Sequence, residues 1–373
     1  MKTRSGQRRN GHEEGDVTTE RDFFAGRRVV VTGGVGTVGR ELVRRLQTLP
    51  VAEIRILDNN EDALFFVGNE YAADSRVQLF HCDVRDADKV ERMFAGMHLG
   101  FHTAALKHVP LCERSPASAV NTNIVGVQNV IRAATVNHLS HLLFTSSDKA
   151  VNPTNVMGTS KLMGERLVTA SNAVQQDGRS CVFVSTRFGN VAGSRGSVIP
   201  LFCQQIEAGQ PITLTDPAMT RFVMTIADSI EFLIQALMLA KGGEVFITKM
   251  PAIRMVDLAE TLIELVAPVF GRDPAAVETR IVGPRPGEKM WEELSTDEET
   301  RRSYDVGELL VILPAFRDIY DRIDYSYGGL DLIPNPQTYH SAAITPMNRD
   351  ELRAFLLRPG VLPESIRAKL GSS

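Results

Sequence analysis

The chain has 373 residues, of which 43% are hydrophobic and 23% charged, as expected for a soluble globular protein that buries a large core. Its formal net charge of -4 gives no sign of the basic face that nucleic-acid-binding proteins usually carry. No segment reaches the roughly 18 uncharged apolar residues that a membrane-spanning helix needs. The four cysteines lack the paired spacing of metal ligands, so we expect core thiols in a cytoplasmic protein and no metal site.

Residues 1–22 are polar and charged, and they predict a disordered lead-in. Their basic start is not followed by an apolar segment, so the pattern is not that of a secretory signal.

A short β-branched segment at residues 28–32 is followed by a glycine-rich turn and a helical pattern that runs through Leu46. Strand, glycine turn and helix in this order predict a dinucleotide site, where one glycine makes the turn, one lets the backbone approach the pyrophosphate and one lets the helix pack on the strand. The residues expected at this site are Gly33, Gly36, Thr37, Val38 and Gly39.

The next predicted strand, residues 54–57, ends at Asp58. A carboxylate there can accept hydrogen bonds from the adenosine ribose and repels a 2′-phosphate, so it favours NAD over NADP. The alternative is a solvated turn residue beside Asn59 and Asn60. Further on, residues 99–102 predict a strand that leads into Ala104 and Ala105, whose small side chains let the backbone lie against a cofactor.

The chemistry is concentrated after the predicted strand at residues 141–145. Ser147, Asp148 and Lys149 follow it and offer a hydroxyl, an acid and a base at the edge of a parallel sheet where ligands bind. Met157 and Lys161 are four residues apart on the next predicted helix, so they share a face that can point at the same crevice. A methionine that fills core space is the alternative.

The segment from Ser146 to Lys161 resembles the active-site segment of the extended short-chain dehydrogenase/reductase family. Within that family it is most similar to the nucleotide-sugar 4,6-dehydratases of polysaccharide biosynthesis, which act on UDP-N-acetylglucosamine. Most of the superfamily carries Tyr-x-x-x-Lys where this chain has Met157 and Lys161, although some members of the polysaccharide branch also have methionine. The resemblance covers roughly residues 27–312.

The resemblance implies a Rossmann-type doubly wound parallel sheet with a smaller C-terminal α/β lobe that binds the substrate. We expect the lead-in at residues 1–22, the NAD-binding domain at 23–195, a mainly nucleotide-sugar-binding lobe at 196–318 and an extension at 319–373. It also implies a homo-oligomer. Many relatives in the branch are anchored in a membrane, whereas the apolar segments of this chain are too short to predict a span. Besides the glycine turn and Asp58, the implied cofactor contacts are Asp83, Val84, Ala104, Ala105, Lys107, Asn123, Lys161 and Asn190.

The same resemblance places a UDP-sugar in the C-terminal lobe. Arginine has a planar fork suited to phosphate oxygens and glutamate can accept from ribose hydroxyls, so two arginines and a glutamate form a candidate UDP clamp. Surface ion pairs are the alternative for the arginines, and a solvated loop is the alternative for the Lys-His pair. The implied substrate contacts are Lys107, His108, Asn190, Arg195, Ser197, Thr213, Thr215, Arg221, Arg285 and Glu288.

For a 4,6-dehydratase, the resemblance implies oxidation at C4, loss of the C5 proton and the C6 hydroxyl, and return of hydride to C6. Lys149 would be the C5 base, its pKa lowered by burial and by the charge of Lys161, and Asp148 would be the acid, with a raised pKa. Ser147 would hydrogen-bond the C4 oxygen, and Lys161 would hold the nicotinamide ribose. Met157 cannot accept the C4 proton, so Ser147 or a water linked to Lys161 is expected to relay it.

Two other functions remain open. A UDP-sugar epimerase on the same scaffold would oxidise C4 without net loss of water. A nucleotide-sugar sensor would bind the same ligand without turning it over. The adjacent Asp148 and Lys149 favour dehydration, with inversion at C5, over both.

Overall fold

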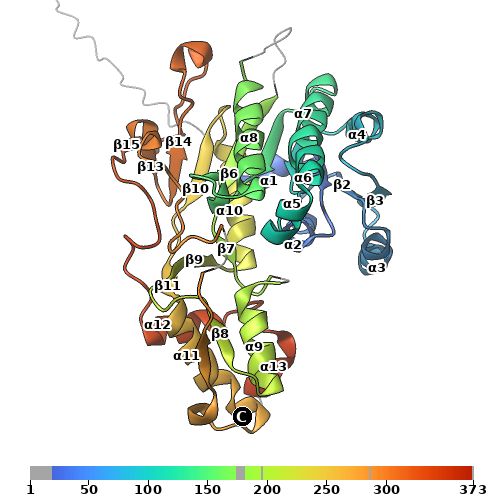
Figure 1. Ribbon diagram of the computed structural model, residues 1–373. Helices are drawn as coiled ribbons and strands as arrows, with labels where there is room; N and C mark the ends of the chain where they lie inside the picture. The colour runs from blue at the N-terminus through green and yellow to red at the C-terminus, as the bar shows by residue number, and fades with distance from the viewer. Residues whose placement is uncertain (1–18, 174–180, 195, 285–286, 372–373) are drawn as a thin grey trace, which may run out of the picture.

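The structure is a computed structural model, and it describes residues 19–173, 181–194, 196–284 and 287–371 (Figure 1). The predicted lead-in falls mostly outside these residues. Its last residues enter the short helix α1 (Glu20–Phe24), which Thr19 caps by accepting a hydrogen bond from the Asp22 amide and which buries Phe24.

In the described part of the chain, ten strands form one sheet in the order β15-β13-β14-β10-β6-β5-β4-β1-β2-β3. From β10 to β3 all neighbouring strands are parallel, whereas β14, β13 and β15 add an antiparallel edge. The strands are β1 (Arg28–Thr32), β2 (Glu53–Asp58), β3 (Val77–His81), β4 (Leu99–His102), β5 (His141–Thr145), β6 (Val182–Arg187), β10 (Val245–Thr248), β13 (Ser303–Val306), β14 (Leu309–Ile312) and β15 (Ile333–Pro334).

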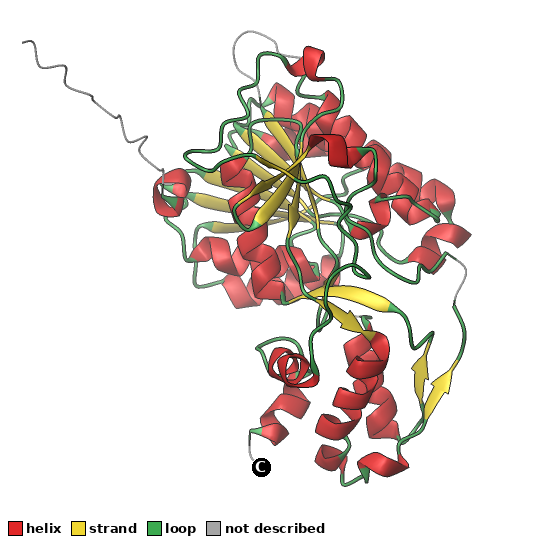
Figure 2. Ribbon diagram, turned by 90° about the vertical axis from the view of Figure 1, so that its left-hand side faces the viewer, coloured by secondary structure: helices red, strands yellow, loops and turns green. Residues whose placement is uncertain are grey.

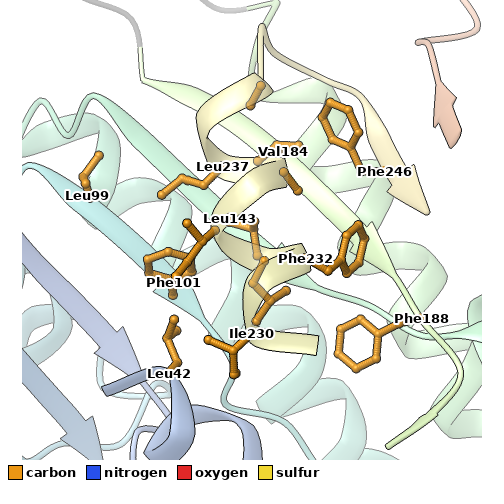
Figure 3. Close-up of a cluster of buried hydrophobic side chains, with 14 of the residues drawn as sticks. Leu42, Leu99, Phe101, Leu143, Val184, Phe188, Ile230, Phe232, Leu237 and Phe246 are labelled. Atoms are coloured by element: carbon orange, nitrogen blue, oxygen red, sulfur yellow. The ribbon is translucent and has the colours of Figure 1, made fainter. Parts of the chain in front are cut away.

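Helices cover both faces of this sheet, which explains why its strands are continuous apolar segments. Because side chains alternate along a strand, Val29 and Val31 pack with α2, α3 and α10 on one face, and Val30 packs with α4, α7 and α8 on the other. Figure 3 shows the first of these faces, where Ile230 and Leu237 of α10 meet the sheet. The helices are α2 (Thr37–Gln47), α3 (Glu61–Tyr71), α4 (Ala87–Phe94), α5 (Val109–Arg114), α6 (Pro116–Val120), α7 (Gly126–Val136), α8 (Val156–Ala170) and α10 (Ile226–Leu239). The predicted doubly wound Rossmann-type sheet is confirmed.

Between α6 and α7 the chain makes one π-helical turn, Asn121–Val125. The helix α8 ends at Ala170, and residues 174–180 lie outside the described part of the chain.

The smaller lobe lies beyond the carboxyl ends of the parallel strands and has a hydrophobic core of its own (Figure 2). A three-stranded sheet, β11-β9-β7, and a two-stranded sheet, β12-β8, accompany its helices. Its elements are β7 (Asn190–Val191), α9 (Val198–Ala208), β8 (Ile212–Leu214), β9 (Thr220–Met224), β11 (Ala252–Arg254), α11 (Met255–Val266), β12 (Thr279–Ile281), α12 (Arg349–Leu356) and α13 (Glu364–Leu370). Short 3-10 turns lie at Asp148–Ala150, Pro268–Phe270, Pro274–Ala276, Glu299–Arg302 and Arg317–Tyr320.

The chain crosses between the two parts several times, whereas the sequence predicts one division after residue 195. The strands β10, β13 and β14 belong to the large sheet although they lie within residues 196–318. The C-terminal helices α12 and α13 instead pack into the core of the lobe. Among the described helices, none is both long and apolar enough to cross a membrane.

Candidate active site

The glycine turn after β1 is closed by backbone-to-backbone contact. Gly33 has φ +71°, and a Cβ placed on it would lie 2.6 Å from the Ala104 nitrogen. A Cβ on Gly39 would lie 2.3 Å from the Gly33 oxygen, so α2 packs on the turn only because this residue is glycine. β1 and β4 are neighbours here although they are not consecutive, which is the point where ligands bind in such sheets.

A hollow of about 290 Å³ lies at this turn, and Gly36 and Thr37 form part of its wall at the start of α2. The backbone amides at a helix start suit a phosphate group, and Gly36 has no side chain to block its approach. These residues therefore fit the pyrophosphate of a dinucleotide. Val38 instead packs against the hydrophobic core.

Asp58 lies at the end of β2, beside the glycine turn. Its carboxylate accepts hydrogen bonds from the Val35 amide at 3.2 Å and the Asn60 amide at 3.0 Å. The predicted ribose acceptor thus also supports the turn itself.

Asp83 forms an ion pair with Arg85. Hydrogen bonds from the Arg85 side chain keep the pKa of the Asp83 carboxyl well below its usual range. Val84 is buried, and a Cβ on Gly126 would lie 2.8 Å from it, so it packs against the start of α7.

The loop after β4 is fixed by Asn123 in the π-helical turn. The Asn123 amide accepts from the Leu106 amide at 2.8 Å and donates to the Leu106 oxygen at 2.9 Å and to Ser160 Oγ at 2.9 Å. Asn123 therefore connects the cofactor-side loop to α8, in line with a positioning role. Ala105 is half-buried in this loop, whereas Lys107 and His108 are exposed.

At the end of β5 the predicted acid and base form an ion pair. Lys149 Nζ lies 3.0 and 3.1 Å from the two carboxylate oxygens of Asp148, and Ser147 Oγ donates to Asp148 at 2.8 Å. The Asp148 side chain is 6% exposed and that of Lys149 is 35% exposed. The pair lies in a 3-10 turn, in which the Lys149 amide donates a hydrogen bond to Ser147 Oγ.

The expected lowering of the Lys149 pKa is wrong for this state of the protein. Burial does lower it, but the charges of Asp148 and Glu292 outweigh burial and raise the pKa of Lys149. The sequence places Asp148 beside Lys149 but does not show that a second carboxylate folds against them.

Glu292 is the functional residue that sequence reasoning missed. It is 5% exposed, and its carboxylate accepts from Asn190 Nδ2 at 2.7 Å and from the Phe222 amide at 2.9 Å. Burial and the charge of Asp148 raise the pKa of Glu292. The only signal in the sequence is that Glu292 lies four residues after the expected clamp residue Glu288.

These groups open onto one cavity of about 280 Å³, the catalytic cavity. It brings together the turn after β5, the start of the lobe and the segment after β12. Its walls are Val109, Pro110, Asp148, Lys149, Thr154, Asn155, Asn190, Arg221, Gly287, Glu288, Lys289 and Glu292.

A second hollow of about 300 Å³, the lobe hollow, continues into the smaller lobe. Its walls include Asn190, Ser197, Thr213, Thr215, Arg221 and Glu288, which the sequence assigns to the substrate. Thr213 Oγ1 is tied to Gln205 at 2.9 Å. The Ser197 hydroxyl is buried and has no hydrogen-bond partner among the described residues, so it is free for a ligand. The predicted contacts Arg195 and Arg285 lie outside the described part of the chain.

Lys161 is buried beneath the active-site strand. Its ammonium donates to the Thr145 oxygen at 2.8 Å and lies 4.8 Å from the centre of the Phe144 ring. Burial lowers the pKa of Lys161 to about 8, against the smaller opposing effect of Glu165. It does not contribute to the wall of the catalytic cavity.

Met157 packs as a core residue. It is 3% exposed and lies in a small apolar cluster with Cys112 and Ala119, away from the cavity wall. Its helical register with Lys161 is as predicted, but α5 and α6 cover this end of α8. Its contacts therefore fit the alternative interpretation, a methionine that fills core space, better than a position at the cavity wall.

Comparison with known proteins supports this architecture. An uncharacterised membrane protein of Methanocaldococcus jannaschii is 44% identical over 79% of this chain and 87% of its own length. A UDP-glucose 4-epimerase of Rickettsia felis is 34% identical over 92% of this chain and 99% of its own length. The crystal structure of Pen from Bacillus thuringiensis superposes with a TM-score of 0.82 at 36% identity, over 90% of this chain and 98% of that one.

The fold and the family of the chain are those of the extended short-chain dehydrogenase/reductases. More distant structures of nucleotide-sugar dehydratases and epimerases, at 19–23% identity, share the fold. The chain belongs to the family described as polysaccharide biosynthesis protein, whose sequence profile matches residues 29–314.

Proposed function

We propose that the protein is an NAD-dependent 4,6-dehydratase that converts UDP-N-acetylglucosamine to a UDP-4-keto-6-deoxy-hexosamine with inversion at C5. The observation that carries the proposal is the Asp148–Lys149 pair, which faces the catalytic cavity together with the buried carboxylate of Glu292. Removing water across two carbon atoms needs both a base and an acid, and this cavity supplies ionisable groups of both kinds.

Simple C4 epimerisation makes a smaller demand on the site. It moves a hydride off C4 and back, and it needs proton transfer only at the C4 hydroxyl. The pair of Asp148 and Lys149 would then have no step to perform. Dehydration uses both residues, which is why we rank it first.

NAD, when bound, would take the hydride from C4 and return it to C6. Gly33, Gly36 and Thr37 would hold its pyrophosphate and Asp58 its adenosine ribose. Lys161 would supply positive charge that favours the alkoxide at C4. Ser147 would hydrogen-bond the C4 oxygen and pass the C4 hydroxyl proton to water, which requires Ser147 to turn away from Asp148.

Asp148 and Lys149 would act as one unit at C5 and C6. The charged pair holds the same number of protons as a neutral carboxylic acid beside a neutral amine, and only one proton has to cross the hydrogen bond to interconvert them. The neutral pair has a base for the C5 proton and an acid for the departing C6 hydroxyl. Closure of the cavity by substrate would favour this form, because desolvation disfavours the two charges.

The substrate would extend from the catalytic cavity into the lobe hollow. Arg221 and Glu288 border both spaces, so the diphosphate and ribose would be held at their junction. A homo-oligomer in the cytoplasm is part of the proposal, and the exposed apolar side chains of Leu111 and Met163 on the neighbouring helices α5 and α8 are in line with it.

A UDP-sugar 4-epimerase is the second candidate. It is favoured by the Rickettsia felis relative of that name, which matches over almost its entire length. The Asp148–Lys149 pair ranks it second, because epimerisation at C4 would leave this pair without a step.

Mass spectrometry of UDP-N-acetylglucosamine incubated with the purified protein tests the proposal. Loss of one water, with deuterium entering at C5 in heavy water, is the expected result. An unchanged mass with a new C4 epimer would identify the epimerase instead. A Lys249→Met variant, altered at an ion pair on the surface, should behave as the wild type.

A further inference from the structure

The catalytic cavity and the lobe hollow meet at Arg221, which borders both. Its guanidinium lies 3.4 Å from a carboxylate oxygen of Glu288 and 3.4 Å from one of Glu292. Of the two spaces, Glu292 borders only the catalytic cavity. The lobe hollow beyond Arg221 is lined mostly by hydroxyl and apolar groups, with the Glu288 carboxylate and the Asn190 amide at its junction with the cavity. One cation therefore stands between the expected position of the diphosphate and a buried carboxylate beside the acid-base pair.

Charged groups face Glu292 from several elements. Asp148 and Lys149 lie on the turn after β5, and Arg221 lies on β9. From the C-terminal segment, Ser341 Oγ accepts from the Glu292 amide at 2.9 Å, with His340 next to it in sequence. Its own segment carries Glu288, Lys289 and Glu293, of which Lys289 and Glu293 pair with each other.

We propose that Glu292 couples substrate binding to proton uptake: a diphosphate that engages Arg221 leaves Glu292 protonated, and the loss of its charge frees Lys149 to act as base. The inference rests on the proposed function, because it needs an anion at Arg221. It makes Glu292 a positioning residue that acts through Lys149.

The coupling follows from the charges. With the lobe hollow empty, Arg221 and Lys149 both favour the ionised form of Glu292, against burial and Asp148. Phosphate oxygens at Arg221 neutralise one of these two cations, so the ionised carboxylate loses part of its support, its pKa rises further, and it takes up a proton.

The second half of the proposal concerns Lys149. The ionised Glu292 is one of the two carboxylates whose charges raise the pKa of Lys149. Protonation of Glu292 removes that contribution and lowers the pKa of Lys149. The neutral amine of Lys149 therefore forms more readily only after the nucleotide is in place. Before substrate binds, Lys149 stays charged and paired with Asp148.

Proton uptake on binding tests this directly. The protein is mixed with saturating UDP-N-acetylglucosamine in weak buffer that contains a pH-indicator dye, at several pH values above the ordinary pKa of a glutamate. Dehydration itself neither takes up nor releases protons, so a rapid change proportional to protein concentration reports binding. We expect uptake of a fraction of a proton, at most about one per site.

The Glu292→Gln variant should bind the nucleotide sugar without this uptake, whereas the matched Glu293→Gln variant should retain it. Binding by wild-type protein without proton uptake would overturn the inference and leave the proposed function standing. No binding at all would overturn the proposed substrate and the inference with it. Uptake that persists in Glu292→Gln would assign the proton to another group and also overturn the inference. The wild-type measurement decides the matter even if a variant does not fold.

Discussion

Lys149 Nζ lies within hydrogen-bond distance of both carboxylate oxygens of Asp148, and the Ser147 hydroxyl shares one of those oxygens. Asp148 thus accepts hydrogen bonds from two donors of its own turn. Any role for either partner in proton transfer has to begin by breaking or neutralising this pair.

The Asp148→Asn variant should uncouple C5 exchange from loss of water. Without the carboxylate, Lys149 loses a charge that raises its pKa, so it can still take the C5 proton. The C6 hydroxyl then departs without its acid, and we expect dehydration to fall by about 10²–10⁴-fold. Deuterium incorporation at C5, followed by nuclear magnetic resonance, and product mass measure the two steps. Loss of both in equal measure would contradict the division of roles.

The Met157→Tyr variant should not restore faster C4 chemistry. Met157 is enclosed by Cys112 and Ala119, so the larger ring is overpacked and should cost about 1–3 kcal/mol of unfolding free energy. Met157→Leu conserves volume and should cost less than about 1.5 kcal/mol. Urea unfolding and single-turnover oxidation at C4 measure both effects. A large gain in oxidation rate for the tyrosine variant would show that the natural site is impaired.

Lys161 should make stability depend on alkaline pH. Its folded pKa of about 8 lies below the unfolded value, so the unfolded chain binds more protons between the two. The free energy of unfolding therefore gains a favourable contribution as pH rises from about 8 to about 10.4, of up to about 3 kcal/mol. The difference between wild type and Lys161→Met, measured by urea unfolding across this range, isolates the effect from cysteine titration. A constant difference would show that Lys161 has an ordinary pKa.

Two glycines of similar helical setting should respond in opposite ways to alanine. Gly39→Ala places a Cβ 2.3 Å from the Gly33 oxygen, so the turn must shift and NAD affinity should fall at least about tenfold. Gly68 lies in α3 with no heavy atom within 4 Å of an added Cβ, so Gly68→Ala should leave NAD binding unchanged and stabilise the protein by about 0.5–1 kcal/mol. Titration of both purified variants with NAD, followed by calorimetry, compares them. Equal affinities would remove the glycine turn from the cofactor site.

Much of the sheet was predictable because its signals are local. The β-branched segment that becomes β1 and the glycine turn after it specify strand, turn and helix within a few residues of one another. Asp58 is likewise placed by the end of its own strand. The same holds for Asp148 and Lys149, which the sequence puts at the carboxyl edge and the structure finds at the cavity wall. Ser147 lies beside them and donates to Asp148.

Contacts between segments that are distant in the sequence could not be predicted from it. Glu292 meets Asn190 and Arg221 across 102 and about 70 residues of chain, and no periodicity in either segment indicates this meeting. The predicted direction of the Lys149 pKa shift was wrong because the charge of the neighbouring Asp148, with a smaller contribution from the distant Glu292, outweighs burial. For Met157, helical spacing predicts the face of α8 on which it lies. Whether that face borders a cavity or a core depends on α5 and α6, which pack against it.

The return of β10 and β14 to the large sheet has a consequence for how the chain can be divided. β6 lies between β5 and β10 and is hydrogen-bonded on both sides. A fragment that ends after β6 would leave the amides and carbonyls of β6 that face β10 unpaired. Such an exposed apolar edge strand is a template for aggregation. The two halves should therefore unfold in a single cooperative transition, and the cofactor half is not expected to survive as an independent building block.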